Sequence, residues 1–458
     1  MYKEDTIAAI ATAAGEAGVA IVRLSGMDAE RIAGRVFVRQ HGRNGKLRSH
    51  TLYHGEIRDP RSGRVLDEVL LTVMRKPHSY TGEDVVEIHC HGGMFLVRQV
   101  LGVILAQGAR HAEPGEFTKR AFLNGRIDLT QAEAVLDLVR ARAQKAADFA
   151  LSQARGELGH WIGELKEELL DVLVQVEAAI DFPEEELELL QHQDLITKIS
   201  SLMAKINGII DTYEWGRLFR EGARVCICGR PNVGKSSLLN ALVGENRVIV
   251  TPVPGTTRDV IEDSLNLEGL PLVLWDTAGV RETEDEVERI GVDMSWAHIE
   301  KADAVLVVLD GSEPLTEEDI CLLREIKNKN SVVVINKRDL VQKISPNNLN
   351  DISDARITLR ISALTGEGVR DLKRHLRELL LVPNPRPTIV LTRERHKSAL
   401  LRGRQALNSA LEAVKEVQPP EVIAVSLQEA RESLEEIVGA VTSDDILERI
   451  FNDFCIGK

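Results

Sequence analysis

Apolar residues follow two different periods along the chain. From the N-terminus to about Gly115, short apolar runs such as 19–24 and 85–90 are broken by glycines, which is the pattern of strands. From Leu129 to Ile180, apolar residues recur at helical spacing among Ala, Leu, Glu, Arg and Gln, until Asp181-Phe182-Pro183 interrupts them. We therefore predict an N-terminal α/β unit followed by long helices.

Helical spacing returns at residues 193–219, 393–417 and 427–451. Between the first and second of these stretches, strand-like and helix-like runs alternate. Helices on both sides indicate that this alternating block is inserted into a helical domain, as domains with neighbouring termini allow. We expect a multidomain fold of α/β and α type, with an N-terminal α/β domain at 1–120, a discontinuous helical domain at 121–221 and 382–458, and an inserted P-loop domain of Ras-like type at 222–381.

The inserted block carries a phosphate-binding motif. Gly229-Arg230-Pro231-Asn232-Val233-Gly234-Lys235-Ser236 matches G-x-x-x-x-G-K-[ST] directly after an apolar strand and before a helix-like run. In this motif the glycines let backbone N–H groups surround phosphates, Lys235 reaches the β- and γ-phosphates, and Ser236 binds Mg²⁺. Asp276-Thr277-Ala278-Gly279 follows a second apolar strand and places an acid on the magnesium side.

Base selection is assigned to Asn336-Lys337-Arg338-Asp339, which follows the strand 332–335. Asp339 can accept hydrogen bonds from N1–H and the 2-amino group of guanine, and adenine has neither donor. GTP is therefore the expected nucleotide. Thr257, in the Gly255-Thr256-Thr257-Arg258-Asp259 segment, is the expected second Mg²⁺ ligand. The full predicted nucleotide site comprises Asn232, Val233, Gly234, Lys235, Ser236, Ser237, Thr251, Pro252, Val253, Pro254, Gly255, Thr256, Thr257, Asp276, Thr277, Ala278, Gly279, Asn336, Lys337, Asp339, Ser362, Ala363 and Leu364.

The motifs at 229–236 and 255–259 resemble those of the translation-factor-like bacterial GTPases that act in tRNA modification and ribosome assembly. The N-terminal α/β unit, the split helical domain and the closing Cys455-Ile456-Gly457-Lys458 make the whole chain similar to the MnmE (TrmE) family, which modifies uridine 34 of tRNA. The resemblance implies a homodimer that works with the flavoprotein MnmG. It also implies that a one-carbon unit from 5-formyltetrahydrofolate or a related folate is used to build a carboxymethylaminomethyl group.

The position after Asp-Thr-Ala-Gly, where many GTPases orient water with Gln, is Val280, which cannot form that hydrogen bond. The resemblance assigns this role to Glu288. Taken without it, Glu288 is one acid in a charged run typical of a solvated surface. The resemblance also implies a K⁺ ion held by Asn232, Thr251, Val253 and Thr256, whose charge can offset the charge that develops in the transition state.

The resemblance further assigns folate binding to Arg23, Glu87, Arg126 and Lys458. Arg126 lies where some relatives have Lys, a change that keeps the charge but alters the hydrogen-bond geometry. Cys455 would be delivered with Lys458 into the folate pocket as a catalytic residue, although an unimportant frayed tail is the alternative for such a terminus. His89-Cys90-His91 could suggest a metal, but strand alternation directs Cys90 to the face opposite the two histidines.

Composition narrows the possible partners of this 458-residue chain. Its net charge of −14 argues against a protein that coats nucleic acid unaided. Residues 31–55 carry six Lys and Arg residues and no acid, which is compatible with a local RNA contact or simply with a solvated surface. The five scattered cysteines and the absence of a signal-peptide pattern favour a reducing cytoplasm, with Cys226 and Cys228 expected in the core. Apolar runs are too short to span a bilayer, so no membrane role is expected.

Two other functions share the nucleotide motifs. One is a ribosome-assembly GTPase that switches without covalent RNA chemistry, and the other is a scaffold whose hydrolysis times partner release. Fold alone does not separate these functions from tRNA modification.

Overall fold

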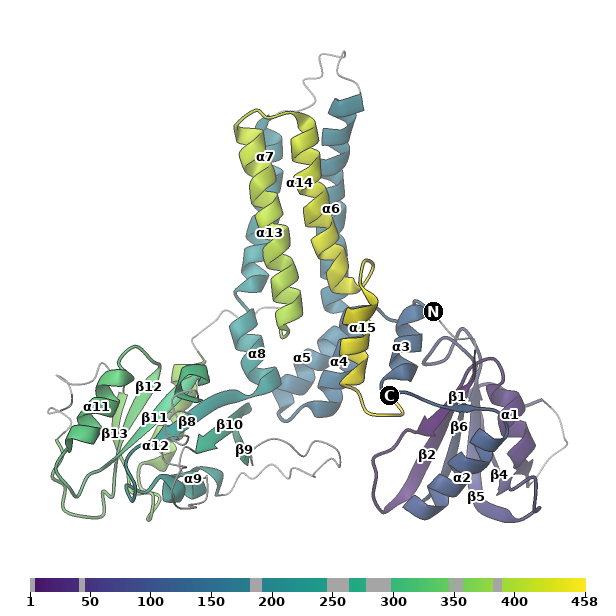
Figure 1. The fold of residues 1–458 in the computed structure, drawn as a ribbon, viewed down its shortest axis with the longest axis horizontal. Helices are drawn as coiled ribbons and strands as arrows, with labels where there is room; N and C mark the ends of the chain where they lie inside the picture. Colours follow the sequence, from purple (N-terminus) through teal and green to yellow (C-terminus); the bar gives the residue numbers. More distant parts are fainter. Residues whose placement is uncertain are drawn as a thin grey trace, which may run out of the picture. The chain divides into compact units, whose positions relative to one another are not determined.

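The computed structural model describes residues 5–40, 46–181, 192–244, 263–276, 298–345, 349, 357–381 and 389–458. The described chain divides into two compact units. One unit comprises residues 1–136, 151–202 and 402–458, and the other comprises 137–150 and 203–401. The predicted multidomain architecture, with an α/β unit, a helical part and an inserted P-loop fold, is confirmed by the elements below (Figure 1).

The first unit contains a seven-stranded sheet of order β3-β4-β5-β6-β2-β1-β7. Its pairs are antiparallel except β1 with β7. Apolar residues at every second position fill one face, which helices α1 (Ala29–Val36) and α2 (Met94–Ala106) cover. The strands are β1 (Ile7–Ile10), β2 (Ala17–Ser25), β3 (Phe37–Arg39), β4 (Leu52–Arg58), β5 (Val65–Met74), β6 (Val85–Gly92) and β7 (Arg110–His111).

Helical segments from distant parts of the sequence complete this unit. Helix α14 (Pro420–Val438) packs along α6 (Glu157–Asp181), and Lys166 of α6 pairs with Glu435 of α14 at 3.0 Å (Figure 1). Helix α15 (Asp444–Asn452) contacts α3 (Glu116–Leu123). Phe451 and Phe454 pack there against Leu129, which begins α4 (Leu129–Arg140). The C-terminal segment is thereby packed against α3 and the start of α4.

Most helices follow the predicted spacing, but two expected stretches are each divided into two helices. The stretch 193–219 is α7 (His192–Ile210) and α8 (Tyr213–Glu221), which are separated at residues 211–212. The expected helix 427–451 is two helices, α14 and α15. Gly439 adopts φ 84° as the left-handed C-cap of α14, and the Ser443 hydroxyl accepts from the N–H of Ile446 to start α15. The other helices outside the P-loop fold are α5 (Gln144–Ala154) and α13 (Glu394–Lys415).

The second unit is built on a six-stranded sheet of order β13-β12-β11-β8-β10-β9, in which only the β9–β10 pair is antiparallel. Its elements are β8 (Ala223–Cys228), α9 (Lys235–Val243), β9 (Asp263–Leu267), β10 (Leu270–Asp276), β11 (Ala304–Asp310), α11 (Glu317–Glu325), β12 (Ser331–Asn336), β13 (Ile357–Arg360) and α12 (Val369–Leu380). This alternation of parallel strands and helices is the predicted Ras-like arrangement.

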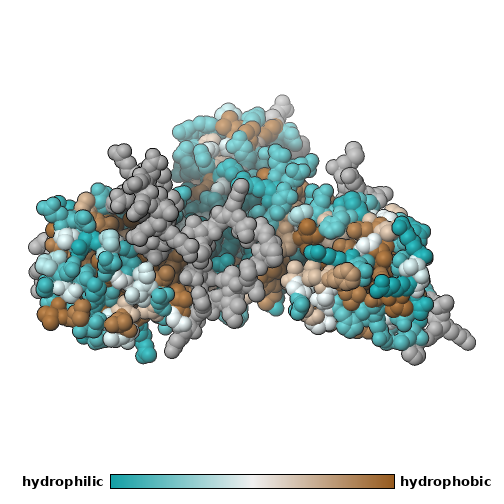
Figure 2. Space-filling model, turned by 60° about the horizontal axis from the view of Figure 1, so that its bottom comes forward, coloured by the Kyte–Doolittle hydropathy of each residue, from teal (hydrophilic) through white to brown (hydrophobic). Residues whose placement is uncertain are grey.

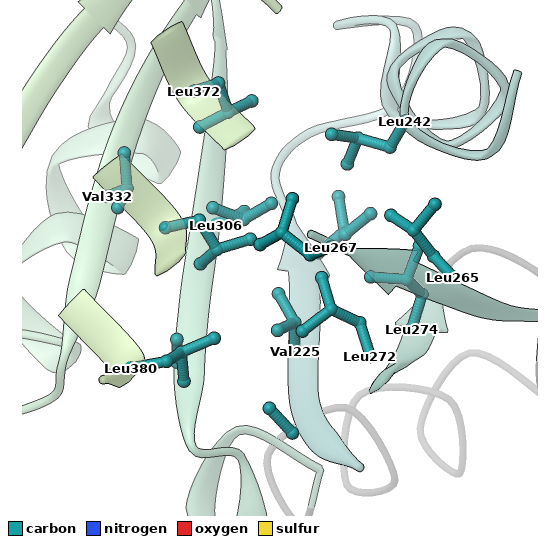
Figure 3. Close-up of a cluster of buried hydrophobic side chains, with 14 of the residues drawn as sticks. Val225, Leu242, Leu265, Leu267, Leu272, Leu274, Leu306, Val332, Leu372 and Leu380 are labelled. Carbon is teal, nitrogen blue, oxygen red and sulfur yellow. The ribbon is translucent and has the colours of Figure 1, made fainter. Parts of the chain in front are cut away.

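Two apolar clusters hold the six-stranded sheet between its helices. On one face, Val225, Leu272 and Leu306 meet Leu242 of α9 and Leu372 and Leu380 of α12 (Figure 3). On the other face, Cys226 and Cys228 pack with strand residues and α11, so their predicted place in the core is confirmed. All five cysteines are free thiols.

The surface offers no membrane-spanning element in the described chain. The face shown in Figure 2 is mostly hydrophilic, with hydrophobic residues in separate patches. None of the described helices is both long enough and apolar enough to cross a bilayer.

Candidate functional site

The phosphate loop joins the end of β8 to the start of α9, as the motif predicts. Gly234 has φ 98° and precedes Lys235, the first residue of α9. A Cβ atom at Gly234 would lie 2.3 Å from Nδ2 of Asn336, so only glycine fits this loop. Val233 is buried, whereas Asn232, Ser236 and Ser237 are exposed toward solvent. The loop therefore presents polar groups at a helix N-terminus, where anions bind.

Lys235 is held above this loop. Its ammonium group donates hydrogen bonds to the carbonyl oxygens of Gly229 at 2.7 Å and Arg230 at 2.8 Å. The side chain is 8% exposed, which places a positive charge in a partly desolvated position. Such a charge interacts more strongly with a phosphate than an exposed one would.

Asn336 connects the phosphate loop to the predicted base loop. Its Nδ2 donates to the carbonyl of Val233, and its Oδ1 accepts from the N–H of Ala363, each at 2.9 Å. Because Asn336 is 3% exposed, both bonds are shielded from water. The structure thus brings together the motifs at 229–236, 336–339 and 362–364.

The carboxylate of Asp339 is exposed but oriented. The Ser362 hydroxyl donates to Oδ1 of Asp339 at 2.5 Å and accepts from the N–H of Thr365 at 3.1 Å. The serine therefore fixes the carboxylate while leaving its second oxygen available to a ligand. Leu364, also predicted in this loop, is 83% exposed.

Asp276, the acid predicted to lie on the magnesium side, is at the same edge of the sheet as the phosphate loop. Asp276 ends β10, which runs parallel to β8 with Asp276 opposite Ile227. The carboxyl ends of parallel strands meet at one edge of a sheet, so Asp276 lies at the edge from which the phosphate loop leaves. The other predicted site residues lie outside the described residues, as does Val280: they are Thr251, Pro252, Val253, Pro254, Gly255, Thr256, Thr257, Thr277, Ala278, Gly279 and Glu288.

Sequence reasoning missed two acids beside this site. Asp310, 5% exposed, pairs with Lys337 at 2.5 Å, and Asp319, 1% exposed, pairs with Arg230 at 2.9 Å. Burial alone would raise the pKa of Asp310, but hydrogen bonds from Lys337 and Ser312 outweigh burial and hold it below its usual range. For Asp319 the sequence carried a signal, because Thr316-x-x-Asp319 is a helix-capping pattern.

A second group of predicted residues meets in the other unit. Arg23 on β2 lies opposite Glu87 on β6, and its Nε donates to Oε1 of Glu87 at 2.8 Å. The guanidinium also lies 5.5 Å from the ring centre of Tyr80 and 5.7 Å from that of Phe117. A cation between aromatic rings next to a carboxylate suits a ligand that has both a flat ring and acidic groups.

The C-terminal residues 455–458 reach the same place. Ile456 forms an antiparallel bridge with Pro114, and the N–H of Phe117 donates to the carbonyl of Lys458 at 3.2 Å. Arg23 donates to the carbonyl of Gly457 at 3.4 Å. Gly457 has φ 97°, and a Cβ there would lie 2.2 Å from the oxygen of Ile10, so this close approach requires glycine. The backbone carbonyl of the exposed Cys455 accepts from the N–H of Gly115 at 3.4 Å.

One predicted folate residue is not brought to this group. Arg126 is exposed after α3, and among the described residues no hydrogen bond or ion pair joins its side chain to Arg23 or Glu87. His89 was not predicted to bind folate, but it lies at this group. Its buried Nε2 lacks a hydrogen-bond partner in the described chain and lies 3.6 Å from Oε2 of Glu87. Unused polar atoms of this kind fit a bound polar cofactor.

The expected orientation of His89-Cys90-His91 is confirmed. Cys90 is 2% exposed on the covered face of the sheet, and burial raises the pKa of its thiol to about 11. The His91 side chain is 70% exposed and pairs with Asp67. The structure therefore separates the thiol from the imidazoles.

Two family models match this chain. The family model described as the MnmE helical domain matches residues 129–455, and the model described as the GTP-binding protein TrmE N-terminus matches residues 6–126. The G domain of the FeoB iron transporter from T. maritima is 29% identical, covers 35% of this chain and 99% of its own, and has a TM-score of 0.27. At that TM-score the likeness carries no weight beside the strand order given above.

Full-length relatives are more informative. The tRNA modification GTPase MnmE of Syntrophotalea carbinolica is 50% identical over 462 residues, covering 100% of both chains. The protein of the same name from Natranaerobius thermophilus is 45% identical over 99% of this chain and 100% of its own. The chain therefore belongs to the MnmE family of GTPases.

Proposed function

We propose that this chain is a K⁺-dependent GTP hydrolase of tRNA modification. Together with the flavoprotein MnmG, it adds a carboxymethylaminomethyl group to C5 of the wobble uridine at position 34, using a folate one-carbon unit. The convergence of Arg23, Glu87 and the C-terminal residues 455–458 is the observation that carries this proposal, because a GTPase that only switches has no need for a second polar site. The relatives' shared name supports tRNA as the RNA.

In the nucleotide site, the chain's own residues bind and orient GTP. Lys235 and the loop N–H groups hold the phosphates, and Asp339 selects guanine. Ser236 and Thr257 would hold Mg²⁺, and Asn232, Thr251, Val253 and Thr256 would hold K⁺. Bound there, these cations would supply positive charge that offsets the charge of the phosphate oxygens. Glu288 orients the attacking water, a role that Val280 cannot take.

In the second site, Glu87 and Arg23 bind and orient the folate, with Lys458 arriving from the C-terminus and Arg126 contributing positive charge. The folate supplies the one-carbon unit. Cys455, which arrives with Lys458, takes part in the modification reaction next to the folate. The protein works as a homodimer, and its free thiols and RNA substrate are consistent with the cytoplasm.

The nucleotide chemistry is tested by Glu288→Ala and by exchange of salts. The variant should keep its affinity for GTP while turnover falls about 10²–10³-fold, since losing one positioning group typically costs that much. Wild-type turnover should also fall when Na⁺ replaces K⁺. Phosphate release, measured in each salt at saturating GTP, checks both statements, and equal rates in K⁺ and Na⁺ would remove the cation from the mechanism.

The RNA chemistry is tested by mass analysis of wobble nucleosides. Cells that lack this protein should accumulate tRNA without the carboxymethylaminomethyl group, and the wild-type gene should restore it. Unchanged nucleosides together with immature ribosomal subunits would instead support the ribosome-assembly switch.

A further inference from the structure

Both nucleotide-recognition loops are tied to a segment that belongs to neither of them. This segment, Asp310–Asp319, runs from the end of β11 into the first turn of α11. We propose that it positions the phosphate loop through the Arg230–Asp319 pair and the base loop through the Lys337–Asp310 pair, so that each half of GTP recognition has its own support. Neither acid is part of the predicted nucleotide site.

The phosphate half is supported from the side chain of Arg230. Its Nε lies 2.9 Å from Oδ1 of Asp319, while Thr316 donates its N–H at 3.1 Å and its hydroxyl at 3.0 Å to Oδ2 of Asp319. Both oxygens of this buried carboxylate are therefore used, and the N-terminus of α11 favours its negative charge. Because the carbonyl of Arg230 accepts from Lys235, the pair acts at the point where the loop holds its lysine.

The base half is supported by a separate set of contacts. Nζ of Lys337 lies 2.5 Å from Oδ2 of Asp310, and Ser312 donates its N–H at 2.9 Å and its hydroxyl at 2.6 Å to Oδ1. Lys337 has φ 61°, a conformation that costs energy for a residue other than glycine and persists only where its surroundings hold it. The N–H of Gly311 donates to the carbonyl of Asn336 at 3.0 Å, so the same segment also fixes the start of the base loop.

Separate supports predict separable defects. Disrupting Arg230–Asp319 should weaken the hold on phosphates without changing the choice of base. Disrupting Lys337–Asp310 should lower the preference for guanine, because Asp339 lies two residues beyond Lys337 on the loop that Asp310 holds. A pair that only stabilises the fold would behave like a matched pair away from both loops, so its loss would lower the melting temperature without speeding nucleotide release.

The test measures dissociation of a fluorescent GDP and the relative affinities for GTP and inosine triphosphate, which lacks the 2-amino group. Arg230→Met and Asp319→Asn should each speed GDP release about tenfold, as expected for loss of a hydrogen bond between charged groups, with the GTP-to-inosine ratio unchanged. In the Asp319→Asn variant the side-chain oxygen can still accept from the N–H of Thr316, so the capping box of α11 is kept. Asp310→Asn should instead lower that ratio about tenfold.

Three further variants make the result decisive. Arg230→Lys keeps the charge and should release GDP within about threefold of the wild-type rate. The double variant Arg230→Met with Asp319→Asn should be no worse than the more affected single variant, because the two residues act as one unit. Arg217→Met is the matched control, since Arg217 pairs with Asp303 at a similar exposure, 16% against 19% for Arg230, away from both loops.

The outcomes separate this inference from the assignment of GTP. Failure of the wild-type protein to bind GDP would overturn the nucleotide site itself. If the wild type binds, but Asp310→Asn leaves the GTP-to-inosine ratio unchanged, or Arg217→Met speeds GDP release as much as Arg230→Met does, then the two pairs are general supports of the fold and the inference is wrong. A lower melting temperature in the Arg217→Met control, with normal GDP release, supports it.

Discussion

At the residue scale, the proposed selection of guanine depends on one oriented carboxylate, that of Asp339. Ser362 occupies one oxygen of Asp339, so guanine must be read by the other oxygen and the geometry that the serine imposes. Asp339→Asn replaces an acceptor with a donor facing N1–H and the 2-amino group, and it should weaken GTP binding strongly, up to about 10⁴-fold. Affinity for xanthosine triphosphate should rise, because its 2-oxo group accepts from the new amide. Competition binding with the two nucleotides measures both changes, and unaltered GTP binding would show that the base lies elsewhere.

Gly234 is a second single residue on which GTP binding should depend. Gly234→Ala would put a Cβ 2.3 Å from Nδ2 of Asn336, at φ 98°. We expect at least about a tenfold loss of GTP affinity, because both the loop and its bond to Asn336 must shift. Gly269→Ala is a matched control, since its φ is 94° but no atom lies within 4 Å of the added Cβ. Calorimetric GTP titration should show the loss only at position 234, and equal losses would attribute the effect to backbone strain alone.

Residue spacing was sufficient to predict that the short motifs of the proposed nucleotide site lie together. Lys235, Asn336 and Ser362 follow strands in short motifs, and the structure brings them together. The Arg230–Asp319 pair was not predictable, because its members lie 89 residues apart and an isolated Asp in a helix cap has an adequate local purpose. For Arg126 the resemblance predicted more than the contacts show, since it assigns Arg126 to the folate site but no described contact joins Arg126 to Arg23 or Glu87.

At the scale of elements, α3 is attached to β1 and the segments around it by buried charges. Arg120, 3% exposed, donates to Asp5 at 2.5 Å and to Glu116 at 3.0 Å. Burial alone would raise the pKa values of Asp5 and Glu116, but hydrogen bonds from Arg110 and Arg120 outweigh it and hold both below their usual range. Since the folded pKa values are lowered, this stabilisation is present above about pH 4.5 and is lost as the pH falls through the folded values.

Arg120→Met should therefore destabilise α3 most at neutral pH, by about 1–3 kcal/mol, because it removes a buried charged partner from Asp5 and Glu116, although Arg110 still pairs with both. The difference from wild type should shrink toward pH 3 as those carboxylates bind protons. Hydrogen exchange of the α3 amides, compared between the two proteins at each pH, measures it. Arg31→Met, which removes an exposed pair with Asp28, should leave the exchange of these amides close to that of the wild type at every pH. A gap that persists at pH 3 would contradict this account.

Element types were predictable from spacing, but their ends depended on single backbone conformations. Helical periodicity runs through 427–451, yet Gly439 leaves the helical region and Ser443 begins a new helix. The strand alternation around Cys90 was sufficient to assign its face. The attachment of residues 455–458 was predicted only by resemblance, because a bridge between Ile456 and Pro114 depends on contacts far apart in the sequence.

At the scale of the whole molecule, insertion of the P-loop fold was predictable, but its closest helical neighbours were not. Residues 137–150, 203–221 and 389–401 group with the nucleotide domain. Phe149 and Phe219 have ring centres 5.6 Å apart, and Trp215 lies 5.0 Å from Phe219, so an aromatic cluster joins α5 and α8 to this fold. Helical periodicity identifies the helices but contains no information about which core they join.

The two sites belong to different units, so their activities should separate by mutation. Lys235 and Asp339 lie in one unit, whereas Arg23, Glu87 and Cys455 lie in the other.

Cys455 is exposed, and the backbone of its segment, rather than its thiol, makes the contacts with Pro114 and Phe117. Cys455→Ser should therefore preserve the fold and leave GTP turnover within about twofold of wild type, while abolishing or sharply lowering modification of uridine 34. Phosphate release by the purified variant and mass analysis of wobble nucleosides from cells that carry only this variant measure the two activities. Full modification by the variant would reduce Cys455 to a structural neighbour of the folate residues, and an equal loss of both activities would mean that the thiol supports the whole molecule instead of one reaction.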